Sequence, residues 1–158
     1  DKYAKWAFPT SNLKNLIPLV RERVDKFSDV IGLIHFFLSA DVGLTEESFE
    51  EIKLDRKEVL RIFQFSLWRL EAIKEWNRDS IQNELQCLSE QLDIKLREFL
   101  SPLFVAITGK SVSISVIESI AIIGIDVSRA RIRDAVKVLG GISKKMQKSL
   151  SAEYRELA

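Results

Sequence analysis

The sequence has one cysteine, Cys87, and one histidine, His35, among 158 residues. A single thiol excludes an internal disulfide and favours a reducing, cytoplasmic setting. A structural zinc ion needs about four cysteine or histidine ligands, so two such residues nearly exclude a dedicated zinc site. His35 lies in an apolar segment, which favours a core or interface histidine over a catalytic base. Cys87 lies between leucines, and we expect it to be buried and inert.

The phosphate-binding and nucleophile motifs of common enzymes are also absent. The six glycines form neither G-x-G-x-x-G nor G-x-x-x-x-G-K-[ST], and there is no G-x-S-x-G. We therefore expect this chain to be non-catalytic by itself and to bind no cofactor. It begins at Asp1 rather than Met, so we expect it to be a fragment of a longer protein.

Long hydrophobic runs are missing as well. The longest apolar stretches, residues 30–38 and 114–125, are too short and too interrupted to span a bilayer, and no secretory signal is visible. Hydrophobic residues make up 46% and charged residues 30% of the chain, which is typical of a globular protein. Because the net charge is only +1, any contact with nucleic acid must come from local basic patches.

Apolar residues recur at helical spacing along nearly the whole chain, which predicts an all-α fold of short helices in two packed groups. We expect helices near residues 13–24, 29–38, 55–76, 79–92, 94–108, 116–123, 127–139 and 143–158. In the first of these, the inward face is expected to hold Leu13, Leu16, Ile17, Val20 and Val24. The chain divides most naturally near residues 41–44, giving subdomains of residues 1–42 and 43–158.

Particular residues predict where several of these helices begin and end. Asp55 and either Asp79 or Ser80 are suited to cap helix starts, whereas Gly109 and Gly124 are suited to end helices. Pro102 predicts a kink or a fresh helix start. Residues 111–117 alternate β-branched residues with serine and resemble a strand locally, but the flanking glycines favour a loop followed by a helix.

Two basic clusters are candidates for contact with a phosphate backbone. Arg21 and Arg23 are two residues apart and diverge by about 200 degrees on a helix, so both cannot face one ligand; spacing alone favours solvated surface. In the second cluster, Arg129, Arg133 and Lys137 step by four and form one stripe. The stripe suits an RNA backbone, and solubility explains it equally well. Other basic residues of this cluster are Arg131, Lys144, Lys145 and Lys148.

Three segments resemble one family, the bacterial glutamyl-tRNA synthetases. Residues 101–109, SPLFVAITG, look like the family signature P-L-R-x-A-L-T-G. Residues 116–124, VIESIAIIG, are similar to its L-F-E-I-L-A-L-L-G helix, and residues 16–24, LIPLVRERV, resemble its L-x-x-L-x-R-x-R segment. The likeness keeps the order and spacing of the segments and covers essentially the whole chain.

The resemblance implies a helical, cage-like region of two anticodon-binding subdomains at the C-terminal end of a class I ligase. Residues 1–42 would end the first subdomain and residues 43–158 would form the second. The implied partners are the anticodon stem-loop of tRNA(Glu) and a catalytic domain of the same chain, in a monomer. ATP and Mg²⁺ would bind that catalytic domain, because the HIGH-like and KMSKS-like motifs are absent from this sequence.

The resemblance also implies roles for single residues. Arg23 falls where the family has an arginine that reads the last anticodon base, with Arg21 beside it. Ser113 and Val116 fall in the loop and helix start that cradle anticodon nucleotides. Phe104 stands where the family commonly has a base-reading arginine, and phenylalanine either stacks on a base or withdraws into the core. The basic helix from residue 129 to 137 would contact the RNA backbone.

A helical protein-interaction module without RNA binding is the alternative. The near-neutral net charge and the apolar segment around His35 favour it.

Replacing Arg23 with Ala tests the implied base contact. In the intact ligase, Arg23→Ala should lower kcat/KM for charging tRNA(Glu) by the equivalent of roughly 1–3 kcal/mol, which is the usual contribution of one good base contact. Steady-state aminoacylation measures this, and unchanged kinetics would remove Arg23 from the site.

Overall fold

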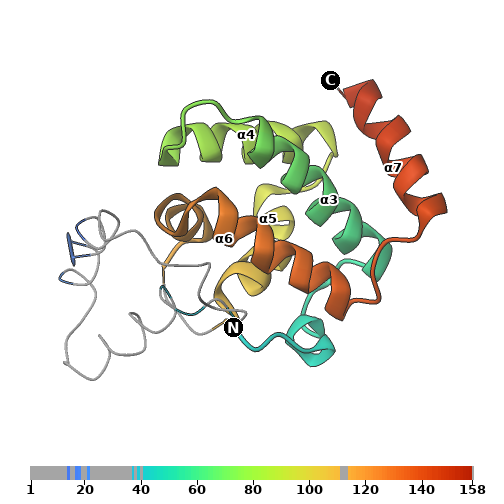
Figure 1. The fold of residues 1–158 in the computed structure, drawn as a ribbon. Coiled ribbons are helices and arrows are strands. Elements are labelled where there is room, and N and C mark those ends of the chain that lie inside the picture. Colours follow the sequence, from blue (N-terminus) through green and yellow to red (C-terminus); the bar gives the residue numbers. More distant parts are fainter. Residues whose placement is uncertain are drawn as a thin grey trace.

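The computed structural model describes residues 41–110 and 114–157, together with positions 14, 17, 18, 21, 37 and 39. Within these residues every regular element is a helix, which confirms the predicted all-α fold (Figure 1). The elements are the 3-10 helix η1 (Glu46–Phe49) and the α-helices α3 (Arg56–Ala72), α4 (Arg78–Gln91), α5 (Leu96–Thr108), α6 (Val116–Val138) and α7 (Lys144–Leu157).

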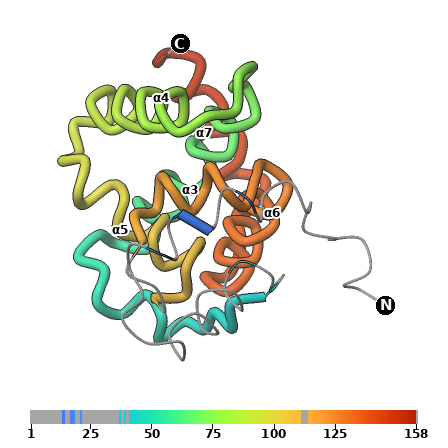
Figure 2. The backbone as a smooth tube through the Cα atoms, turned by 90° about the vertical axis from the view of Figure 1, so that its left-hand side faces the viewer, coloured from blue at the N-terminus to red at the C-terminus, as the bar shows by residue number. Residues whose placement is uncertain are grey.

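Helices α5 and α6 form the most extensive packing pair of the fold. Helix α3 packs against both of them and against α4, whereas α7 contacts α3 at the edge of the bundle. Figures 1 and 2 show α4 above α6 in both views and α7 extending away from the other helices in Figure 1. The first residues of α6 and one face of α5 line the two sides of the pocket described below.

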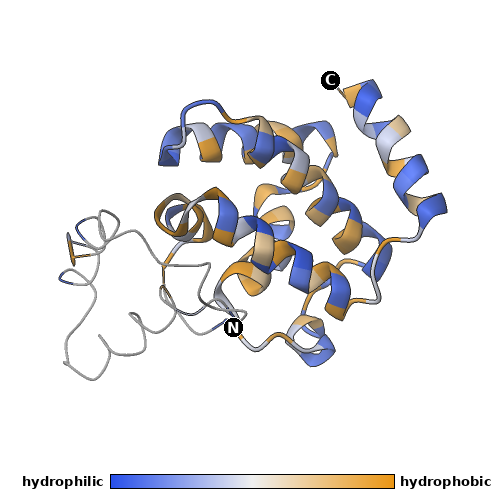
Figure 3. Cartoon of the chain, in the orientation of Figure 1, coloured by the Kyte–Doolittle hydropathy of each residue, from blue (hydrophilic) through white to orange (hydrophobic). Residues whose placement is uncertain are grey.

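The buried residues of the described helices recur at helical spacing, in agreement with the apolar periodicity of the sequence. Figure 3 shows hydrophobic and hydrophilic residues side by side on each helix, as expected for amphipathic helices. Residues with no measurable exposure include Ile62, Phe63, Ile81, Leu85, Leu88, Phe99, Leu103, Ile107, Ile120 and Ile132.

Helix starts follow side-chain caps. Asp55 accepts a hydrogen bond from the backbone N–H of Glu58 at 2.8 Å, as predicted. Helix α4 begins earlier than predicted, because Asn77 rather than Asp79 or Ser80 caps it; its side chain accepts from the Ser80 N–H at 2.8 Å.

Helix α3 is shorter than predicted and ends at Ala72 instead of near Trp76. The next residue, Ile73, has an extended backbone. The Trp76 indole N–H then donates to the Ala121 carbonyl at 3.3 Å, which ties the α3–α4 connection to α6. A tertiary contact therefore uses residues that helical spacing alone would assign to α3.

Two glycines act as predicted. Gly109 ends α5 with a positive φ of 60°, and a Cβ there would lie 2.9 Å from the Val42 carbonyl oxygen. Gly124 has φ 83° and ψ 171° and bends α6 into two helical segments, close to the predicted helix end. Pro102 is buried inside α5, which continues through it without a fresh start.

Three residues singled out by the sequence are not described by the structure, and one predicted inward position is wrong. Arg23, His35 and Ser113 lie outside the described residues, and the division at residues 42 and 43 stays a prediction. The predicted inward position of Ile17 is wrong, because Ile17 is 65% exposed. The other four apolar residues predicted for that helix face already follow a spacing of three and four residues in the sequence, so the pattern does not require Ile17 to face inward.

Arg131 belongs to the core, although the sequence places it in a basic cluster. It is only 1% exposed and donates to the carbonyl oxygens of Ile107, at 2.5 Å, and of Ser39, at 2.7 Å. Burial lowers its pKa to about 10, and the nearby Asp41 carboxylate raises the pKa in part. The guanidinium therefore stays charged at neutral pH and joins α6 to the end of α5 and to Ser39.

Replacing Arg131 with Met should destabilise the fold while keeping an apolar side chain of similar length. Each buried carbonyl that loses its partner should cost about 1–3 kcal/mol in the free energy of unfolding. Urea denaturation measures this loss. Arg129→Met is the control, because it removes only surface ion pairs and should cost less than about 1 kcal/mol. Equal losses in the two variants would contradict the assigned role of Arg131.

Candidate functional site

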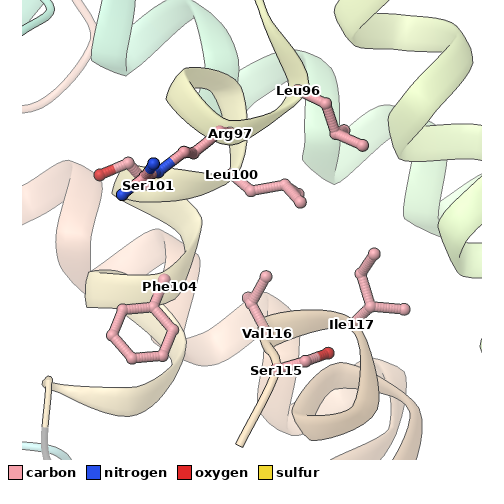
Figure 4. Close-up of a pocket in the computed structure, with 8 residues that line it drawn as sticks. All are labelled: Leu96, Arg97, Leu100, Ser101, Phe104, Ser115, Val116 and Ile117. Atoms are coloured by element: carbon pink, nitrogen blue, oxygen red, sulfur yellow. The ribbon is translucent and has the colours of Figure 1, made fainter. Parts of the chain in front are cut away.

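An open pocket of about 650 Å³ lies between α5 and the start of α6 (Figure 4). Most of its lining surface is apolar. The lining residues are Leu96, Arg97, Leu100, Ser101, Phe104, Ser115, Val116 and Ile117. The pocket therefore brings together Phe104 and Val116, two of the residues that the sequence singles out.

Phe104 is half-buried and forms part of the α5 wall of the pocket. Arg97, Leu100, Ser101 and Phe104 follow the spacing i, i+3, i+4 and i+7, so they share one face of the helix. Figure 4 shows these four side chains along α5 and the Val116 side chain on the α6 wall. Phe104 therefore packs against the core and still presents part of its ring to the pocket.

The opposite wall is the N-terminus of α6. Ser115 caps this helix, and its hydroxyl oxygen accepts from the Glu118 N–H at 3.2 Å. Val116 is 6% exposed, so its side chain helps to anchor the first turn. Backbone N–H groups in the first turn of a helix have no intrahelical acceptor, and the helix dipole is positive there. This wall is therefore suited to an anionic group.

Arg97 is a residue of this pocket that sequence reasoning missed. It is exposed, and among residues 41–110 and 114–157 no carboxylate forms an ion pair with it. It also lines a neighbouring hollow with Glu51, whose carboxylate pairs with Lys110 at 3.0 Å. Its position in the sequence could have indicated this, because Arg97 precedes Phe104 by seven residues, about two helical turns, and so lies on the same face of the helix.

The predicted basic stripe on α6 is largely neutralised by ion pairs. Arg129 and Arg133 both pair with the Glu71 carboxylate of α3, at 2.8 and 3.2 Å, and Lys137 pairs with Asp134 at 2.8 Å. Sequence spacing places the three basic residues on one face, but it cannot show that α3 brings an acid against Arg129 and Arg133. None of the three lines the pocket between α5 and α6.

The basic residues after the stripe lie on α7. Lys144, Lys145 and Lys148 are exposed, and none forms an ion pair with another described residue. Arg21 is also exposed. Their contact with an RNA backbone stays a prediction.

Cys87 is exposed, so the prediction that it is buried is wrong. The inward face of α4 is formed by Ile81, Leu85 and Leu88. Because adjacent residues diverge by about 100 degrees on a helix, the position before Leu88 turns toward solvent.

Among the described residues, no helix has the length and apolar character needed to cross a membrane.

Comparison with known proteins gives both a family and relatives. The family model described as "Anticodon binding domain" matches residues 2–136. The glutamate–tRNA ligase of Marinomonas sp. (strain MWYL1) is 47% identical over 157 residues, which is 99% of this chain and 32% of the relative. That of Saccharophagus degradans is 41% identical over 158 residues, 100% of this chain and 31% of the relative. That of Pseudomonas aeruginosa (strain UCBPP-PA14) is 40% identical over 144 residues, 91% of this chain and 29% of the relative.

The chain thus spans about a third of the length of these relatives.

Proposed function

Because the chain belongs to the anticodon-binding domain family, we propose that it is the anticodon-binding region of a glutamate–tRNA ligase. It recognises tRNA(Glu), and a catalytic domain elsewhere in the protein attaches glutamate with ATP and Mg²⁺. The observation that carries the proposal is the family match over residues 2–136, which includes the whole pocket between α5 and α6. The ligases that match over nearly the full chain support it further.

The pocket has the properties that single-stranded RNA needs. Proteins read loop nucleotides by splaying the bases out and stacking them on aromatic or guanidinium planes. Here a half-exposed phenylalanine ring, an apolar wall and a helix N-terminus border one open hollow. A base would occupy the apolar wall, and its phosphate would lie near the positive groups.

The helical bundle gives this pocket a rigid frame. The α5 wall is anchored on its far side by Phe99, Leu103 and Ile107, which are fully buried. A ligase that charges the far end of a tRNA needs its anticodon contacts at a fixed distance from the active site. Buried side chains on both walls supply that rigidity without any catalytic group.

The anticodon stem-loop is the proposed RNA element, with backbone contacts from exposed cations that set its register. The catalytic domain of the same chain is the proposed protein partner, and we propose a monomer in the cytoplasm.

Salt dependence tests the proposal against a helical protein-interaction module. Affinity of the intact ligase for tRNA(Glu) should fall steeply as salt rises from 50 to 200 mM, because about one counterion is released per phosphate contact. Filter binding or fluorescence anisotropy measures the slope. Absence of tRNA binding would overturn the proposal, and an apolar protein interface would show little dependence on salt.

Replacing Phe104 with Ala tests the pocket itself. Loss of a stacking surface should weaken tRNA(Glu) binding by about 1–3 kcal/mol, with only a modest fall in thermal stability because the ring is half-buried. Phe99→Ala is the matched control: Phe99 is fully buried on the other face of α5, so its loss should destabilise the fold by about 3–5 kcal/mol. Unchanged affinity of a stable Phe104→Ala variant would exclude stacking.

A further inference from the structure

Among the residues that the structure describes, the lining of the pocket between α5 and α6 has almost no group able to read the edge of a base. Five of its lining side chains are apolar: Leu96, Leu100, Phe104, Val116 and Ile117. Base identity is usually read by bidentate arginine, asparagine, glutamine or carboxylate groups. Apart from Arg97, the described polar lining consists of the hydroxyl groups of Ser101 and Ser115. A hydroxyl both donates and accepts, so it accommodates any base edge.

Arg97 is poorly placed to read the edge of a base on Phe104. Seven residues separate the two along α5, a rise of about 10 Å along the helix axis. Figure 4 shows the Arg97 side chain beside Ser101, away from the Phe104 ring. This separation suits the phosphate of a nucleotide whose base lies on Phe104.

Arg97 is also free to bind an anion. Most other arginines in the described part of the chain pair with carboxylates, namely Arg56, Arg61, Arg69, Arg78, Arg129 and Arg133. Arg97 has no such pair among the described residues and is exposed at the mouth of an apolar pocket. The N-terminus of α6, on the opposite wall, adds backbone N–H donors to the same hollow, and the Glu118 carboxylate in its first turn offsets part of the positive helix dipole.

From these observations we propose that the pocket binds one anticodon-loop nucleotide by the face of its base and by its phosphate, without discriminating among the four bases. Phe104 stacks on the base, and Arg97 binds the phosphate. The inference rests on the proposed function and specifies how one nucleotide is held. Stacking accepts every base because each has a π face, and a phosphate contact carries no sequence information.

Variants of Arg97 in the intact ligase test the phosphate contact. Arg97→Ala should weaken tRNA(Glu) binding severalfold and reduce the slope of log affinity against log salt by about one. Arg97→Lys should restore most of the affinity, because a lysine binds phosphate as a point charge but cannot replace a bidentate fork on a base. Lys95→Ala is the control, since Lys95 is exposed near the start of α5 and outside the pocket.

Variants of the tRNA test the tolerance for base identity. Each anticodon-loop nucleotide is replaced in turn by an abasic residue and by the other three bases. At one position, removal of the base should weaken binding by about 5–150-fold, and this loss should disappear in Phe104→Ala. The other three bases at that position should bind within about threefold of the original, because every base has a π face and stacking gives only modest preferences.

The outcomes separate this inference from the proposed function. No binding of tRNA(Glu) by the unaltered ligase overturns both. If the unaltered ligase binds, three results overturn the inference alone: Arg97→Ala that matches the unaltered protein, Arg97→Lys that is as weak as Arg97→Ala, or a strong base preference at the nucleotide coupled to Phe104. Thermal denaturation of each variant verifies that the fold is kept.

Discussion

The arrangement of α5 and α6 depends on the hydrogen bonds that the buried guanidinium of Arg131 donates. A charge in the interior is stable only when it is hydrogen-bonded, and Arg131 meets this need through the carbonyl oxygens of Ile107 and Ser39. Ile107 lies in the last turn of α5, where carbonyl groups lack intrahelical partners. The Arg131 side chain therefore supplies a hydrogen-bond donor to a carbonyl at the end of α5. It also fixes α6 against α5 and holds the backbone at Ser39.

The same packing positions the pocket. With its last turn held by Arg131, α5 presents Phe104 toward the N-terminus of α6, and Gly109 lets the chain pass within contact of Val42. Any side chain at Gly109 would meet the Val42 carbonyl and displace this turn. The site thus consists of two walls whose spacing is set by buried contacts, while the groups that would touch RNA remain at the surface.

Electrostatics divides the basic residues into two classes. At the surface of α6, Arg129 and Arg133 are balanced by Glu71 of α3, and Lys137 is balanced by Asp134 of α6 itself, so these residues stabilise the surface more than they attract an anion. Arg97 and the lysines of α7 have no such partner among the described residues. Of these cations, Arg97 is the one that also lines the pocket between α5 and α6 among the described residues.

The sequence by itself determined the helical class, most helix ends and the resemblance to a family, because apolar periodicity, caps and glycines act over a few residues. It placed Phe104 and Val116 in one site through the order of two segments. It missed the early end of α3, the burial of Arg131, the pairing of Arg133 with Glu71 and the availability of Arg97. Each of these depends on a residue far away in the chain, so only the tertiary structure, which brings the helices into contact, could decide them.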